Sequence, residues 1–246
     1  MADFSEEEVE RYARHLVLRE VGGPGQQKLK AARVLIVGAG GLGAPAALYL
    51  AAAGVGVIGL ADPDKVALSN LQRQVLYGTE DIGRAKVDRA ARRLHDLNPH
   101  VQIEAHAVAV TAENVAGVVE GYDLVLDGTD DFSTRFSVNA ACVAAKKPLV
   151  SGALGRWTGQ VGVFEGRPCY RCLVPDVPPD AETCSAVGVV GALAGVIGAM
   201  MALEAVKRIT GAGEALSGRL LIYDGLAAEA RTVRIGADPD CPVCAR

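Results

Sequence analysis

The sequence predicts an α/β protein in which helices cover both faces of a doubly wound, largely parallel sheet. Two observations carry this prediction. Short apolar runs alternate with helical patterns through the first 155 of the 246 residues, and beyond Gly155 the intervening helices disappear. The second observation indicates that antiparallel strands extend the parallel sheet at its C-terminal end.

The N-terminal helix is predicted from Ser5 to about Arg19, because Ser5 and Glu8 have the spacing of a capping box. Such a helix carries Arg14 on its surface. After it, strand-like and helical segments alternate. Strand-like runs are at 33–39, 55–62, 101–110, 123–128 and 148–154, and helical patterns are at about 42 onward, 84–97, 112–120 and 133–145.

The C-terminal part contains strand-like runs at 159–166 and 218–235, with a proline-rich polar loop at 174–183 between them. Residues 186–203 follow that loop and contain no charge. Their glycines suit close packing against other protein elements, so we expect a buried core or subunit-interface helix rather than a membrane span.

The length fits a single domain over residues 1–246. Within it we expect an N-terminal helical arm (1–30), a nucleotide-binding core (31–155) and a C-terminal part (156–246) made of antiparallel strands, a crossover loop, the apolar helix and a tail.

Composition excludes some classes of function. A net charge of −4 and an aromatic content of 4% argue against nucleic acid as a partner. The first residues are acidic and polar, unlike a secretory signal, so we expect a cytoplasmic protein. In that compartment cysteines serve as metal ligands, reactive thiols or core residues more often than as disulfides.

A glycine-rich turn follows the first apolar run. Gly38, Gly40 and Gly43 form a GxGxxG pattern that also contains Gly41, and Asp62 ends the next strand. This is the Rossmann-like arrangement, in which the turn approaches phosphates and the carboxylate holds a ribose. The pattern does not identify the nucleotide, so an NAD-dependent oxidoreductase remains an alternative.

The long polar loop after Asp62 favours a triphosphate. It contains Asn70, Arg73 and Gln74, and Lys86 follows it. Fixed cations stabilise a triphosphate as charge moves during attack at phosphorus, whereas hydride transfer needs no such cluster.

Carboxylates gather after a later strand of the same predicted sheet. Asp127, Asp130 and Asp131 follow the apolar run at 124–126, where ligands of open α/β sheets bind. A carboxylate at this edge could hold Mg²⁺ against phosphate oxygens, which adds to the case for ATP.

Two CxxC pairs give the strongest metal signal. Cys169 with Cys172 and Cys241 with Cys244 can together supply tetrahedral thiolate ligands to zinc, with no open position, so the metal is expected to be structural. A redox CxxC is the alternative, but it leaves the duplication unexplained. Cys142 is interpreted as a core residue, whereas Cys184, before the apolar helix, is either a nucleophile or an inert helix-start cysteine.

Taken together, these motifs resemble the ubiquitin-activating-enzyme-like adenylyltransferases of bacteria, which act in molybdopterin and thiamine synthesis. The resemblance covers nearly the whole chain. It rests on the segments RYARHLVL, GAGGLGAP, DPDKVALSNLQRQ, GRAK, DLVLDGTDDFSTR, VSGALGRWTGQVGVF, CYRC, TCSAVGVVGALAGVIGAMMALEAVK and CPVC.

The resemblance implies a reaction and a set of residue roles. The enzyme would adenylate the C-terminal Gly-Gly carboxylate of a small ubiquitin-fold sulfur-carrier protein, releasing pyrophosphate and preparing the carrier for thiocarboxylation. Asp62 would hold the ATP ribose, and Asp130 would bind Mg²⁺. The phosphates would be bound by Asn70, Arg73 and Lys86, together with Arg14 from a neighbouring subunit, which implies a homodimer.

Some relatives carry a C-terminal rhodanese domain that this sequence lacks, so sulfur is expected from a separate donor, a rhodanese or a cysteine desulfurase. Cys184 matches a position where some relatives form a covalent bond and others do not. Whether the carrier serves molybdopterin, thiamine or another thio-metabolite stays open. A non-catalytic binding partner of a ubiquitin-like protein is a further alternative.

Overall fold

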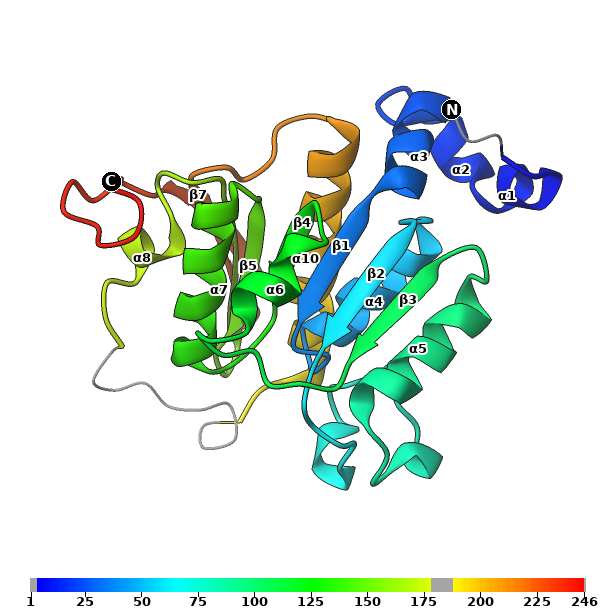
Figure 1. Cartoon of the computed structure of the whole chain (residues 1–246), viewed down its shortest axis with the longest axis horizontal. Helices are drawn as coiled ribbons and strands as arrows, with labels where there is room; N and C mark the ends of the chain where they lie inside the picture. Colours follow the sequence, from blue (N-terminus) through cyan, green and yellow to red (C-terminus); the bar gives the residue numbers. More distant parts are fainter. Residues whose placement is uncertain (1–3, 178–187, 246) are drawn as a thin grey trace.

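The computed structural model describes residues 4–177 and 188–245. Within these ranges the strands form an eight-stranded sheet in the order β3-β2-β1-β4-β5-β6-β7-β8 (Figure 1). Strands β1 to β5 pair in parallel, and β6 to β8 continue the sheet in antiparallel pairing. The strands are β1 (Arg33–Val37), β2 (Val57–Ala61), β3 (Gln102–His106), β4 (Leu124–Asp127), β5 (Leu149–Leu154), β6 (Thr158–Phe164), β7 (Arg219–Asp224) and β8 (Glu229–Arg234).

Helices cover both faces of the parallel part of the sheet. In Figure 1, α6 and α7 lie in front of it and α4 and α10 lie behind. The helices are α1 (Glu6–Arg11), α2 (Ala13–Leu16), α3 (Gly22–Ala31), α4 (Gly43–Ala52), α5 (Lys86–Leu97), α6 (Val115–Glu120), α7 (Phe132–Ala145), α8 (Tyr170–Leu173) and α10 (Gly191–Thr210), with 3₁₀ turns η1 (Leu68–Asn70) and η2 (Thr79–Asp81). The architecture confirms the predicted doubly wound sheet with an antiparallel extension.

The hydrophobic core has two layers, one on each face of the sheet. Strand β1 supplies both, because its side chains alternate: Val34 and Ile36 pack toward α4 and α10, whereas Leu35 and Val37 pack toward α6 and α7. A continuous apolar run is therefore what a strand buried on both faces requires.

The N-terminal segment differs from the prediction. The capping box of Ser5 and Glu8 is present, but the first helix ends at Arg11, a short second one ends at Leu16, and α3 then runs through the glycines at 22, 23 and 25. Tertiary contacts outweigh the poor helix propensity of that segment: Leu29 is fully buried, and the buried Gln26 donates a 2.8 Å hydrogen bond to the Ala53 carbonyl.

The apolar helix is displaced along the sequence relative to the prediction. It begins at Gly191 and continues past residue 203 through the charged Glu204, Lys207 and Arg208. Glu204 is buried, and it pairs with Lys207 at 2.6 Å and accepts a 2.7 Å bond from the Leu216 amide, so its charge is compensated inside the fold. Among the described residues, no helix is long and apolar enough to cross a membrane.

The strand order fixes where a ligand can bind. Strand β1 lies between β2 and β4, so the connections after β1 and β4 leave toward opposite faces of the sheet. This is the switch point at which open α/β sheets form a crevice beyond the carboxyl ends of the strands.

Candidate active site

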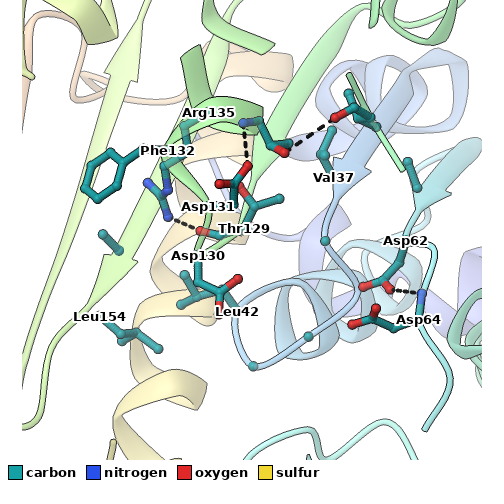
Figure 2. Close-up of a pocket in the computed structure, with 18 of the residues that line it drawn as sticks. Val37, Leu42, Asp62, Asp64, Thr129, Asp130, Asp131, Phe132, Arg135 and Leu154 are labelled. Atoms are coloured by element: carbon teal, nitrogen blue, oxygen red, sulfur yellow. Dashed lines mark hydrogen bonds between the residues drawn. The ribbon is translucent and has the colours of Figure 1, made fainter. Parts of the chain in front are cut away.

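A cavity of about 570 Å³ lies at the carboxyl ends of β1, β2, β4 and β5. Many of the residues that line it are those that the sequence patterns predict for a nucleotide site. They are Gly38, Gly40, Gly41, Asp62, Asn70, Arg73, Gln74, Lys86, Asp130 and Asp131. Figure 2 shows Asp62 and Asp64 on one side of the glycine turn and Asp130 on the other. The structure therefore brings these separate sequence segments into one site.

The glycine turn connects β1 to α4 at the floor of the cavity. Gly38 has φ +87°, a conformation that favours glycine. A Cβ added to Gly43 would lie 1.8 Å from the Gly38 carbonyl oxygen, so Gly43 permits the helix to pack on the turn and does not itself line the cavity. The N-terminus of α4 then faces the cavity, where its backbone N–H groups favour an anion.

Asp62 is fixed by the turn that it faces. Its carboxylate accepts a 2.8 Å bond from the Ala39 amide and a 2.9 Å bond from the Asp64 amide, and the residue is buried. Lys86 lies beside it, also buried, with its Nζ 2.8 Å from Asp64 and 3.7 Å from Asp62. Asp64, which sequence reasoning did not select, therefore holds the lysine in place at the cavity wall.

The loop after β2 places three further polar side chains at the cavity. Asn70 closes the turn η1 by accepting a 3.2 Å bond from the Ala67 amide, and Arg73 donates a 3.1 Å bond to the Ser69 carbonyl. Gln74 is buried, and its Oε1 has no hydrogen-bond partner among the residues that the structure describes. A buried amide oxygen of this kind is costly unless a ligand or water satisfies it, so it fits a binding role.

The aspartates at the end of β4 and just after it have different environments. Asp127 is buried and accepts 3.0 Å and 2.7 Å bonds from the amide and hydroxyl of Thr129. Asp131 caps α7 by accepting a 2.7 Å bond from the Thr134 amide; burial would raise the pKa of Asp131, but its hydrogen bonds with Thr134 hold it below the usual range. Asp130 is exposed and faces the cavity. Of the three, Asp130 is therefore the carboxylate available to a ligand.

Sequence reasoning also missed Arg135, which is buried beside the cavity and donates to the Gly152 carbonyl at 2.6 Å. A polar side chain one helical turn after the capping Asp131 was the signal available, because residues four apart share a helix face.

The four cysteines of the CxxC pairs meet in space, as the sequence predicts. Their Sγ atoms all lie within 4.8 Å of one another. Two of these separations join the two pairs, with the sulfur atoms of Cys169 and Cys241 3.6 Å apart and those of Cys172 and Cys244 3.4 Å apart. Tetrahedral zinc with Zn–S bonds of about 2.3 Å needs sulfur atoms about 3.8 Å apart, so the set could hold zinc.

Hydrogen bonds around the cysteine cluster also fit a metal site. The Asp238 amide lies 3.4 Å from the Cys172 sulfur, and the Asn139 amide nitrogen lies 3.5 Å from the Cys169 sulfur. Burial opposes ionisation of Cys241, but backbone N–H groups at Cys244 and Val243 lower its pKa to about 7, whereas burial and the neighbouring thiols raise the pKa of Cys244. Donors aimed at sulfur stabilise thiolates, which are the form that binds metal.

Two residues that the sequence analysis names, Arg14 and Cys142, lie away from the cavity. Arg14 is on α2, beside the amino-terminal end of the sheet, so it does not reach the cavity of its own chain (Figure 1). Cys184 falls outside the described residues. Cys142 is buried in the core, as expected, and burial raises the pKa of its thiol to about 12, which makes the thiol unreactive.

The fold and cavity define a nucleotide-binding α/β protein with an appended cysteine cluster. The ThiF family model matches residues 12–243, and the chain belongs to that family.

Among curated proteins, the chain is 48% identical to the sulfur carrier protein adenylyltransferase of Thermus thermophilus, covering 98% of this chain and 92% of that protein. It is 48% identical to the probable adenylyltransferase/sulfurtransferase MoeZ of Mycobacterium tuberculosis, covering 97% of this chain and 63% of the relative. It is 47% identical to adenylyltransferase and sulfurtransferase MOCS3 of Culex quinquefasciatus, covering 96% of this chain and 55% of that protein. The chain thus spans nearly all of the first relative and little more than half of the last.

Solved structures show the same architecture. A crystal structure of E. coli MccB with MccA-N7isoASN matches with a TM-score of 0.85 and 25% identity, over 99% of this chain and 76% of that one. The structure of PaaA matches with a TM-score of 0.81 and 25% identity, over 94% of this chain and 75% of that one.

A larger side chain at Gly40, which lines the cavity, tests whether ATP binds there. A Cβ at Gly40 would meet only the Gln74 side chain within 4 Å, at 3.4 Å from its nitrogen. We expect Gly40→Val to fold normally but to lose at least about tenfold in ATP affinity, or about 1.4 kcal/mol, because the larger side chain occupies ligand space. Calorimetric titration with ATP measures this. Gly236→Val, on an open part of the tail, is the control, and unchanged ATP affinity in Gly40→Val would argue against this site.

Proposed function

We propose that this chain adenylates the C-terminal Gly-Gly carboxylate of a small ubiquitin-fold sulfur-carrier protein, consuming ATP and releasing pyrophosphate. One observation carries the proposal. A single cavity gathers the glycine turn, Asp62, Lys86, Arg73 and Asp130, in a chain 48% identical over nearly its whole length to a sulfur carrier protein adenylyltransferase. The product is a mixed anhydride, and the activated carrier is then ready for thiocarboxylation.

The chemistry needs charge compensation more than it needs a base. A peptide carboxylate is already ionised at pH 7, so it can attack the α-phosphorus once it is held in line. Repulsion between that anion and the triphosphate is the main obstacle. Lys86 is held at the wall by Asp64 and Asp62, and Arg73 is anchored at Ser69, so both cations are in place before the substrates arrive.

The remaining roles follow from position in the cavity. Asp62, at the end of β2, would hold the ribose, and Asn70 and Gln74 would contact the nucleotide beside the glycine turn. Asp130 would hold Mg²⁺, whose bound charge offsets that of the phosphate oxygens.

Substitutions at the cavity test the assignment. We expect Arg73→Ala and Asp130→Ala to lower carrier-dependent ATP–pyrophosphate exchange by roughly a hundredfold or more, because each removes an electrostatic contact to the reacting phosphates. Arg93→Ala and Asp96→Ala, which change exposed side chains on α5, are the matched controls. Near-normal exchange in Arg73→Ala or Asp130→Ala, with the fold intact by circular dichroism, would refute the assignment.

We propose that the four-cysteine cluster binds one structural zinc ion. The ion would tie the C-terminal tail to α8, and a four-thiolate site leaves no position for substrate. The donors to the sulfur atoms of Cys169 and Cys172 support this proposal.

Removal of one ligand tests the zinc site. We expect Cys241→Ser to lose the ion and to melt roughly 10 °C lower, as follows from a loss of about 3 kcal/mol in a chain of this size. Metal analysis together with thermal unfolding checks both effects. Cys142→Ala, a buried cysteine outside the cluster, keeps its zinc. Full zinc content in Cys241→Ser would exclude this ligand set.

We also propose that two chains form a homodimer with shared sites. Arg14 lies far from the cavity of its own chain, so it can contribute only to that of a neighbour. The outer face of α10 exposes Val196 and Leu203, and Tyr49 of α4 is 60% exposed. An apolar helix face of this kind fits a subunit interface.

Mixed dimers test the sharing. Arg14→Ala and Asp130→Ala should each be inactive alone. After exchange of subunits we expect about a quarter of wild-type activity, because half of the dimers are mixed and each mixed dimer keeps one intact site. Pyrophosphate exchange measures the recovery. Absence of recovery in a mixture shown by mass to contain mixed dimers would exclude shared sites.

The pathway in which the enzyme would act depends on its sulfur donor and on its carrier protein. We propose a separate sulfur donor, a rhodanese or a cysteine desulfurase, and a carrier that serves molybdopterin, thiamine or another thio-metabolite. Incubation with each candidate carrier and ATP, followed by mass measurement of the carrier, identifies which one becomes adenylated.

A further inference from the structure

The residue that would hold Mg²⁺ sits on a short loop between β4 and α7. Residues 128–131 carry Asp130, and the loop is fixed from below by Asp127, which binds the amide and hydroxyl of Thr129. Asp131 fixes its far end by capping α7. These contacts hold the two ends of the loop. The Thr129 carbonyl, next to Asp130, accepts a hydrogen bond from a residue outside the loop.

That partner is Arg135, which joins the loop to the neighbouring strand. Its guanidinium donates to the Thr129 carbonyl of the loop, to the Gly152 carbonyl of β5 at 2.6 Å and to the Ser151 hydroxyl at 3.3 Å. Figure 2 shows the Arg135 side chain beside Thr129, with Asp130 adjacent. One planar group thus sets the distance between the loop and β5.

The guanidinium has little freedom to move. Arg135 is 5% exposed, and its guanidinium carbon lies 5.9 Å from the centre of the Tyr170 ring. Burial opposes its charge, yet the carboxylates of Asp127 and Asp130 keep the pKa of Arg135 above its ordinary value. A buried charge of this kind adds little net stability, so its value lies in the geometry that it fixes.

We propose that Arg135 is a positioning residue that holds the 128–131 loop against β5 and thereby sets the direction in which Asp130 enters the cavity. The inference rests on the proposed function for the role of Asp130 toward Mg²⁺. A lysine at 135 keeps the positive charge beside Asp127, but a single ammonium cannot reproduce the planar fork that spans the loop and β5.

The variant for the test is therefore Arg135→Lys, and the first measurement is independent of catalysis. We expect backbone amides of residues 129–131 to exchange hydrogen at least about tenfold faster than in the wild type, because the loop loses its tie to β5. Amides of the cysteine cluster keep their rates. Arg171→Lys is the matched control, since Arg171 also contacts α7, stacking 4.2 Å from the Phe136 ring, but does not touch the loop.

The second measurement is calorimetric titration with ATP, with and without Mg²⁺. Without Mg²⁺, the ATP affinity of Arg135→Lys should stay within about twofold of the wild type. The Mg²⁺ concentration that gives half of the increase in ATP affinity should rise by roughly tenfold, because Asp130 is no longer held in place to bind the ion. A purely structural role would lower both affinities and the melting temperature together. Unchanged amide exchange, or an unchanged Mg²⁺ requirement, in Arg135→Lys overturns the proposal.

These readouts separate the two proposals. If the wild type shows no pyrophosphate exchange with any carrier, yet Arg135→Lys loosens the loop and raises the Mg²⁺ requirement, the positioning role stands and the carrier reaction fails. If exchange is normal in both forms with the same Mg²⁺ dependence, the carrier reaction stands and the positioning role fails.

Discussion

Charge balance at the carboxyl edge of β1, β2 and β4 is the constraint on which the site depends. Asp62 and Asp64 both lie near Lys86, whose Nζ is 2.8 Å from Asp64 and 3.7 Å from Asp62. A charge taken out of water is costly unless it is paired, so the buried Asp62 and the buried Lys86 each require a partner at this edge, and the exposed Asp64 provides the shorter contact to Lys86. Because Lys86 is already engaged with aspartates, Arg73 and the N-terminus of α4 add the further positive potential that favours an anionic ligand.

A single helix, α7, organises the other side of the cavity. On α7 the positions 131, 135 and 139 follow one another by one helical turn and share a face. Asp131 caps the helix, Arg135 ties the loop to β5, and Asn139 accepts a 2.8 Å bond from the Tyr170 amide beside Cys169. The same rigid element therefore contacts both the 128–131 loop and the cysteine cluster.

The sequence predicted the sheet and most of the cavity because both follow from local patterns. Apolar runs predict the buried strands, and the spacings of glycines, aspartates and cysteines predict the turn, the strand ends and the four-cysteine cluster. What could not be predicted depends on contacts between distant segments. Helix α3 contains glycines that disfavour a helix, and the packing of Leu29 and Gln26 overrides them. Asp64 and Arg135 look like ordinary surface charges until the fold places them against Lys86 and Gly152.

The central claim is that this cavity selects a magnesium triphosphate, although its glycine turn is shared with dinucleotide-binding proteins. Competition calorimetry on the wild-type chain tests it most directly, by titrating Mg²⁺–ATP into the protein with and without saturating NAD. The account predicts one ATP site per chain whose affinity NAD does not change and Mg²⁺ strengthens. Displacement of ATP by NAD, or binding of NAD with no binding of ATP, would contradict it.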